Sequence, residues 1–137
     1  YPKYMLRTMC KGKIHRATVT QADVNYVGSL TIDEDLMEMA DILAYEEVHV
    51  LNVTNGHRQV TYAMKGERGS GIMCLNGAAA RHGRPGDIII VIAYAHYEDT
   101  EARVMRPKIV IVDEKNRPQE LLETGTTTSD IAAIYGS

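Results

Sequence analysis

The sequence has no tryptophan and no phenylalanine, and it contains only two cysteines among its 137 residues. Tyrosine, methionine and the aliphatic residues must therefore fill the core. Cys10 and Cys74 do not share the spacing of a metal site. They are expected to be buried free thiols in a reducing compartment, with a disulfide between them as the less favoured alternative.

Long apolar runs and a surplus of charge are missing as well. No segment reaches the ~20 apolar residues of a membrane span, and no signal-peptide pattern stands near the N-terminus. The formal net charge is −3, and Lys and Arg are scattered along the chain. A nucleic-acid binder usually carries a basic stripe instead. We therefore expect a cytoplasmic protein whose partners include neither a membrane nor a nucleic acid.

The common catalytic signatures are absent too. There is no P-loop, no G-x-G-x-x-G after a strand and no G-x-S-x-G. The histidines do not form a metal-ligand spacing with acids or cysteines, so no metal is expected. The glycine-rich segment "ERGSG" at 67–71 lacks the lysine and the following helix of a phosphate-binding loop. A hairpin turn is the better interpretation of this segment.

What is present is a succession of short β-rich segments in a chain of single-domain length. Strands are expected at 5–20 (bent at Gly12), 46–53, 58–64, 71–75, 88–95 and 108–113. The Asn-Gly pair at 55–56 predicts a hairpin, and the unbroken apolar run at 88–95 predicts a strand buried on both faces. Without alternation of strands and helices, this pattern favours a compact β-barrel over an open parallel sheet.

Two short helical segments and a tail complete the predicted organisation. A helix over 34–43, capped by Thr31 or Asp33, would bury one side. That side is made up of Leu36, Met39, Ala40 and Leu43. The segment 76–81 is expected to form a turn or a single helical turn, and the segment 98–105 one or two helical turns. From about residue 118 the periodicity fades, which predicts a loosely structured tail or a packed arm.

The stretch "YVGSLTID" contains a Gly-Ser pair, Gly28-Ser29, between two apolar runs. A serine hydroxyl can attack the carbonyl that precedes it and move the acyl group from nitrogen to oxygen. Glycine suits the preceding position because it has no Cβ and tolerates unusual backbone conformations. Elimination and hydrolysis would then release ammonia and leave a pyruvoyl N-terminus. For the dipeptide alone, an ordinary turn is the more frequent explanation.

Several other segments, in this order, resemble the pyruvoyl-dependent aspartate 1-decarboxylase family from about Met5 to about Pro118. These segments are "RTM", "KGKIHRATVTQAD", "YVGS", "TID", "NVTNG", "R-x-V-T-Y-A", "GERGSG", "NGAAA" and "PGDIIIVIAY". The resemblance implies a double-psi β-barrel that cuts itself into a β chain of residues 1–28 and an α chain of residues 29–137. It also implies a homotetramer with active sites between subunits.

The resemblance further implies the reaction and the residues that perform it. L-Aspartate would lose CO₂ and yield β-alanine for pantothenate and coenzyme A, with a pyruvoyl group made from Ser29 as the cofactor. Ser29 would form the Schiff base with substrate, Tyr62 would donate a proton, and Thr61 would assist cleavage at Gly28-Ser29. The substrate-binding residues would be Lys13, Arg58, Asn76, Gly77, Ala78 and Ala79, with His15 as a possible further pocket residue.

Other interpretations stay open at this point. On a regular strand Thr61 and Tyr62 face opposite sides, so either the strand is distorted or the two residues serve different pockets. Some family members carry an aromatic residue at the position of Leu51 and an acid at that of Val27. The aliphatic residues here are expected to reshape the pocket wall and change the speed of self-cleavage. The alternative functions are a non-catalytic double-psi barrel that binds a partner, or an unprocessed precursor.

Overall fold

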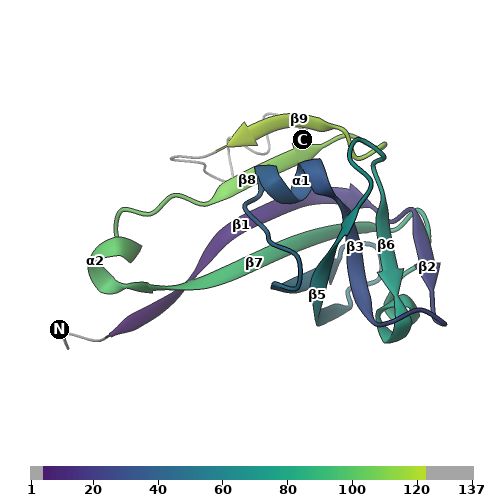
Figure 1. The fold of residues 1–137 in the computed structure, drawn as a ribbon, viewed down its shortest axis with the longest axis horizontal. Coiled ribbons are helices and arrows are strands. Elements are labelled where there is room, and N and C mark those ends of the chain that lie inside the picture. The colour runs from purple at the N-terminus through teal and green to yellow at the C-terminus, as the bar shows by residue number, and fades with distance from the viewer. Residues whose placement is uncertain (1–4, 123–137) are drawn as a thin grey trace.

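The computed structural model describes residues 5–122, which form a mainly β fold with three short helical segments (Figure 1). The strands are β1 (Leu6–Thr18), β2 (Gln21–Asp23), β3 (Ser29–Asp33), β4 (Glu47–Asn52), β5 (Arg58–Gly66), β6 (Met73–Asn76), β7 (Ile88–Glu98), β8 (Lys108–Val112) and β9 (Pro118–Leu122). The helices are α1 (Glu34–Met39), the 3-10 helix η1 (Gly77–His82) and α2 (Asp99–Ala102). The predicted strands, hairpin and helical turns are confirmed, with the differences described below.

Two strands lie in unusual places in the sheet, whose order is β2-β6-β3-β5-β4-β7-β1-β8-β9. Strand β3 pairs antiparallel with β6 and parallel with β5, although β5 and β6 follow each other in the chain. Strand β1 is inserted in the same way between β7 and β8. This repeated insertion is consistent with the expected double-psi β-barrel. It also shows that the predicted hairpin at 67–71 is wrong, because β3 separates the two strands that this turn joins.

The bend in β1 lies at the predicted glycine. The register with β7 shifts between Cys10 and Gly12 and again between Ile14 and Ala17. A Cβ at Gly12 would collide with the carbonyl oxygen of Ala40, just after α1. Glycine at this position therefore lets the strand pass close to the end of the helix. In Figure 1, β1 and β7 continue together as a long ribbon that reaches α2.

Helix α1 begins where the sequence indicates but ends earlier. Asp33 is the N-cap, and its carboxylate accepts a hydrogen bond of 2.9 Å from the backbone N–H of Asp35. Leu36 and Ala40 are fully buried as expected. Leu43, however, is 69% exposed, so its predicted burial is wrong. The helix stops at Met39 and Asp41 takes a φ of 57°, which breaks the helical spacing before Leu43.

Strand β7 is buried on one face rather than on both. Ile89, Val91 and Ala93 are buried in the core, whereas Ile90 and Ile92 on the opposite face are only partly covered. The outer surface of β7 is therefore apolar and half-covered at Ile90 and Ile92. Lys13 of β1 lies beside it, opposite Ile92.

The first residues of the predicted tail are packed on the sheet. Residues 118–122 form β9, which pairs antiparallel with β8. The rest of the predicted tail, from residue 123, lies outside the described residues. Cys10 and Cys74 are both free thiols. Within residues 5–122, none of the helices has the length and apolar character needed to cross a membrane.

Candidate active site

Ser29 is held at the start of β3 in a buried, hydrogen-bonded position. Ser29 is 1% exposed, and it lies directly opposite Asn76 in the antiparallel pairing of β3 with β6. The side-chain amide of Asn76 donates a hydrogen bond of 3.0 Å to Ser29 Oγ and another of 2.8 Å to Thr31 Oγ1. The Ser29 hydroxyl donates in turn to the carbonyl oxygen of Val27, over 3.4 Å. Both a donor and an acceptor therefore orient this hydroxyl.

The backbone of Gly28 is closely packed against Gly77, the first residue of η1. Gly77 has a φ of +61°, and a Cβ there would lie 2.7 Å from both Cα and N of Gly28. Gly28 itself is not in the left-handed region, and a Cβ on it would meet only the Asn76 carbonyl oxygen at 3.9 Å. The backbone conformation that only glycine adopts easily thus belongs to Gly77, beside the candidate cleavage bond.

Replacement of Gly77 by alanine is expected to slow cleavage of the Gly28-Ser29 bond about tenfold or more. The new methyl group would collide with the backbone of Gly28, whose carbonyl Ser29 Oγ attacks, and alanine is itself strained at this φ. Gly56→Ala is the matched control, since Gly56 has a φ of +80° but open space around it. Cleavage followed by mass spectrometry, with Tm alongside, checks the comparison. Equal cleavage rates in the two variants would contradict it.

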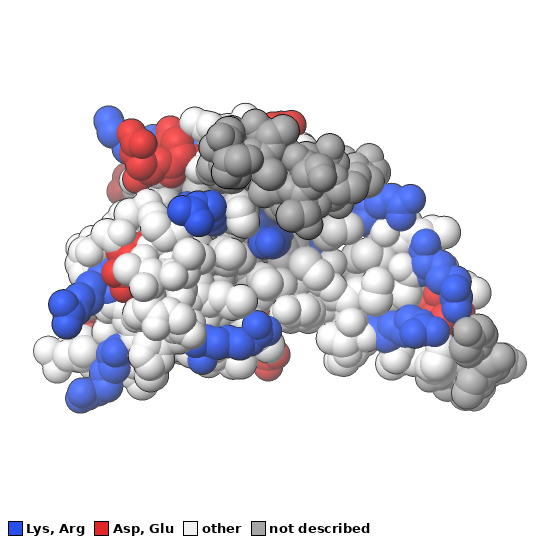
Figure 2. Space-filling model, turned by 180° about the vertical axis from the view of Figure 1, so that it is seen from behind, with Lys and Arg blue, Asp and Glu red and all other residues white. Residues whose placement is uncertain are grey.

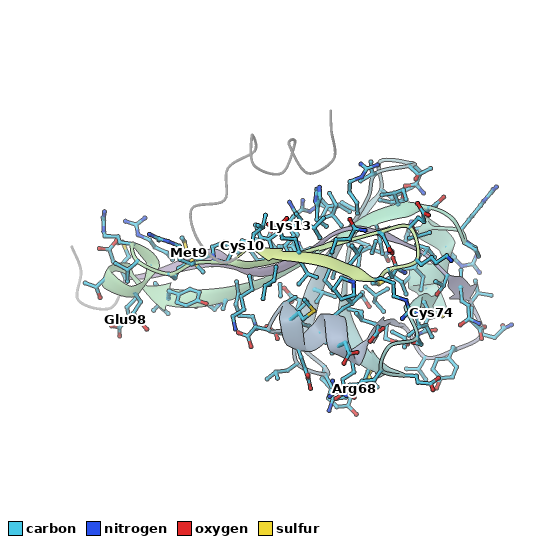
Figure 3. The ribbon with its side chains drawn as sticks, turned by 90° about the horizontal axis from the view of Figure 1, so that it is seen from above. Met9, Cys10, Lys13, Arg68, Cys74 and Glu98 are labelled. Atoms are coloured by element: carbon cyan, nitrogen blue, oxygen red, sulfur yellow. The ribbon has the colours of Figure 1, made fainter. Side chains whose placement is uncertain are left out.

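Gly69-Ser70 is a second Gly-Ser pair in the described part of the chain, and its surroundings are different. It lies in the exposed turn between β5 and β6, where Ser70 Oγ donates to the carbonyl oxygen of Glu67. Arg68 in the same turn pairs with the carboxylates of α1 (Figure 3). Within residues 5–122, Ser70 Oγ accepts from the backbone N–H of Ile72 and has no side-chain amide as a partner. Burial and the Asn76 amide, not the dipeptide, distinguish Gly28-Ser29.

Thr61 and Tyr62 lie on opposite faces of β5, because this strand pairs with β4 in a regular register. Leu30 on β3 pairs with Ala63, and both are buried in the core. Ser29 and Tyr62, which precede them, therefore share the opposite, outer face on neighbouring strands. Thr61 turns to the core face. The strand is not distorted, so the structure favours different surroundings for the two side chains.

The candidate cations lie further around the same outer face. Arg58 donates a hydrogen bond of 3.2 Å to His49 Nδ1 and lies 3.5 Å from the Tyr94 hydroxyl. Arg58 is four residues from Tyr62, or roughly 13 Å along the strand. The sequence analysis did not identify His49 as a site residue. The only indication in the sequence is that His49 is two residues before Leu51, which places both side chains on the same face of β4.

Lys13 belongs to a cross-strand row that joins four strands. Lys13 pairs with Ile92 on β7, Ile92 pairs with His49 on β4, and His49 pairs with Val60 on β5. The sheet order puts four strand spacings between β1 and β3, about 19 Å along the sheet. In Figure 3, Lys13 lies well apart from Cys74, which is on the strand beside Ser29. One chain therefore gathers Ser29, Asn76 and Gly77, but does not bring Lys13 to them.

The remaining predicted pocket residues also lie in two places, some near Gly28 and Gly77 and others near the candidate cations. Ala79 is buried and its carbonyl oxygen accepts a hydrogen bond of 3.3 Å from Gln59, whereas Ala78 is exposed. Leu51 is half-buried on β4 opposite Arg58, and Val27 is exposed beside the cleavage bond. Leu51 therefore lines the surface around the candidate cations, while Val27 belongs to the segment around Gly28.

His15 follows Lys13 on β1 and is neutral at physiological pH. Burial, together with the smaller effect of the charges of Lys13 and Arg16, lowers the pKa of its imidazole to about 4. A neutral imidazole cannot serve as a third cation for substrate carboxylates. If His15 takes part in the pocket, it does so by hydrogen bonding or packing.

The lowered pKa of His15 predicts a loss of stability as the pH falls from about 6.5 toward 4. In that range the unfolded state binds the proton and the folded state does not, so the free energy of unfolding rises with pH. His15→Gln should flatten the dependence of Tm on pH by a few degrees, while His96→Gln, at an exposed position, should not. Identical pH profiles for wild type and His15→Gln would contradict the prediction.

A pocket of about 640 Å³ lies beside Ser29 on the outer face. Its lining includes Thr31, Cys74 and Asn76, together with Tyr26 and Lys65. The sequence did not single out Thr31 or Cys74 as site residues, because neither belongs to a motif with known chemistry. Within residues 5–122, no group of three or more His, Cys, Asp or Glu side chains is arranged to hold a metal ion.

On the face shown in Figure 2, basic side chains are scattered rather than gathered in a stripe. The fold is mainly β, with one sheet whose strand order is consistent with a double-psi β-barrel, and its candidate site centres on a buried Gly-Ser bond. Residues 5–119 match the family model described as aspartate decarboxylase. The chain belongs to the aspartate decarboxylase family.

Two curated relatives carry the name aspartate 1-decarboxylase. The one from Acetivibrio thermocellus is 59% identical over 113 residues, covering 82% of this chain and 90% of the relative. The one from Thermoanaerobacter pseudethanolicus is 60% identical over 114 residues, covering 83% of this chain and 97% of the relative. The family expected from the ordered sequence segments is thus confirmed.

Proposed function

We propose that this chain cleaves itself between Gly28 and Ser29, carries a pyruvoyl group made from Ser29, and decarboxylates L-aspartate to β-alanine and CO₂. The decarboxylation is the reaction of the family, which supplies β-alanine for pantothenate. The observation that carries the self-cleavage is the buried Ser29 hydroxyl, which accepts a hydrogen bond from Asn76 next to a glycine carbonyl.

The proposed cleavage needs only groups that the chain itself supplies, plus water. Ser29 Oγ bonds to the carbonyl carbon of Gly28, the bond from that carbon to Ser29 N breaks, and the hydroxyl proton ends on the freed amine. Loss of the Ser29 Cα proton and of the Gly28 carboxylate then leaves dehydroalanine. Water replaces its nitrogen, which leaves as ammonia. The absence of a side chain at Gly77 supports this step, because a Cβ there would collide with the backbone of Gly28.

Ser29 fits a pyruvoyl group because it is buried, is the first residue of β3 and is bordered by small residues at 28 and 77. Such a group supplies an electron sink for decarboxylation. Tyr62, on the neighbouring strand and the same face, is the proposed proton donor. Lys13 and Arg58 are the proposed partners of the two substrate carboxylates, with Arg58 offering a planar fork.

We further propose a cytoplasmic homotetramer with active sites between subunits. The distribution of these residues supports a site shared between two chains. Lys13 is four strand spacings from Ser29 within one chain, on a half-covered apolar face that a neighbouring subunit could bury. A second copy that docks this face near the Ser29 of the first would bring cations and cofactor together. A homo-oligomer with repeated, equivalent interfaces makes such docking available to every chain.

Mass spectrometry of the denatured protein, combined with an activity assay, tests the proposed function. We expect fragments 1–28 and 29–137, with the larger lighter by one ammonia than a fragment that begins with serine. The cleaved protein should release CO₂ from L-aspartate and not from L-glutamate, which is one methylene longer. A single intact chain that still decarboxylates aspartate would refute the pyruvoyl part of the proposal. A cleaved chain without activity would refute the catalytic part.

A further inference from the structure

Cys74 contacts the group that orients the candidate nucleophile. Its thiol donates a hydrogen bond of 3.1 Å to Asn76 Oδ1, the oxygen of the same amide whose nitrogen donates to Ser29 Oγ. Cys74, Asn76 and Ser29 are all buried, with Cys74 only 6% exposed. The three side chains form a linear series of contacts from β6 to the cleavage bond on β3.

The thiol determines which way the Asn76 amide faces. A side-chain amide can turn by half a rotation and exchange its oxygen and nitrogen. Burial raises the pKa of the Cys74 thiol, and the nearby charge of Asp23 raises it further, so the thiol stays protonated at neutral pH. A protonated thiol is a donor and favours the amide oxygen as its neighbour. The amide nitrogen is then directed to the hydroxyls of Ser29 and Thr31.

This orientation matters for the chemistry of Ser29 Oγ. As the oxygen attacks the Gly28 carbonyl it gives up its proton and gains negative character. An N–H that donates to the oxygen stabilises that charge, because the donor is already in place before the reaction. In the reversed orientation, the amide oxygen would face Ser29 Oγ and destabilise the negative charge that develops on it. The hydroxyl proton would also be held by the amide rather than free to leave.

We propose that Cys74 is a positioning residue for self-cleavage, whose thiol holds Asn76 in the orientation that donates to Ser29 Oγ. This inference rests on the proposed self-cleavage at Gly28-Ser29. It assigns Cys74 no contact with substrate and no covalent step. Its effect reaches Ser29 only through Asn76.

The rate of precursor cleavage in Cys74 variants tests the inference. Cys74→Ser keeps a donor and should cleave within about twofold of wild type. Cys74→Ala and Cys74→Val lack a donor and should cleave about 5- to 10-fold more slowly, the loss expected for one positioned hydrogen bond. Freshly purified precursor would be followed by mass spectrometry, and Tm measured for each variant. A purely structural role for Cys74 would make cleavage follow Tm rather than the presence of a donor.

A double-mutant cycle separates action through Asn76 from direct effects. In an Asn76→Ala background, Cys74→Ala should change the cleavage rate by less than twofold. The inference is overturned if Cys74→Ala and Cys74→Val cleave like wild type, if Cys74→Ser is as slow as they are, or if the effect persists fully without Asn76. If wild type itself is not cleaved, the proposed function fails and the inference with it. Normal wild-type cleavage with unaffected Cys74 variants removes only the inference.

Discussion

Ser29→Ala is expected to leave the chain in one piece and to abolish decarboxylation of L-aspartate. The substitution removes the only atom of the side chain that can attack the Gly28 carbonyl, and with it the precursor of the pyruvoyl group. The rest of the site should be little changed, because Asn76 keeps Thr31 as a partner. Mass spectrometry should therefore show one intact chain with a Tm close to that of wild-type precursor. Activity should fall to the background of the assay.

Ser70→Ala provides the matched control for this experiment. Ser70 also follows a glycine, but it lies in the exposed turn between β5 and β6. Its variant should be cleaved at residue 28 and remain fully active. Measurable turnover by a confirmed, uncleaved Ser29→Ala protein would mean that the reaction needs no pyruvoyl group from this serine. Loss of activity in both variants would point to a general effect on folding.

The local elements of this fold were largely predictable from short stretches of sequence. The Asn-Gly pair at 55–56 and the Asp33 cap each depend on residues close together in the chain, and Gly12 marks its bend by interrupting a β-rich segment. The insertion of β3 between β5 and β6 was not predictable in the same way. It depends on pairings between segments more than thirty residues apart. The pattern of residues within a strand does not say which distant strand it pairs with.

The candidate site shows the same division between local and distant information. Ser29, Asn76 and Gly77 were identified through segments that resemble a family, and the structure brings them together. Cys74 gave no signal, because a single buried cysteine in a strand usually serves only packing. Its importance depends on the amide two residues later, and on which hydroxyls that amide reaches across the sheet. Such contacts require the register of β3 and β6.

Hybrid oligomers of Ser29→Ala and Lys13→Met chains are expected to be active, although each variant alone is impaired. Ser29→Ala lacks the nucleophile, and Lys13→Met should cleave itself but lose about 30-fold or more in kcat/KM through one charged contact. If each site takes Ser29 from one chain and Lys13 from another, about a quarter of the sites in a random equal mixture are intact. Co-expression with two affinity tags, followed by tandem purification, gives the hybrids for the decarboxylation assay.

The decisive control places both substitutions on one chain and co-expresses it with wild type. Sites shared between chains predict about a quarter of wild-type activity in both mixtures, since either arrangement leaves the same fraction of sites with both residues. Sites contained within one chain predict about half of wild-type activity for this control and almost none for the first mixture. The separation of Lys13 from Ser29 by four strand spacings favours the equal outcome. Unequal activities would place the lysine in the same chain as the serine it serves, and about half of wild-type activity in both mixtures would place it outside the site altogether.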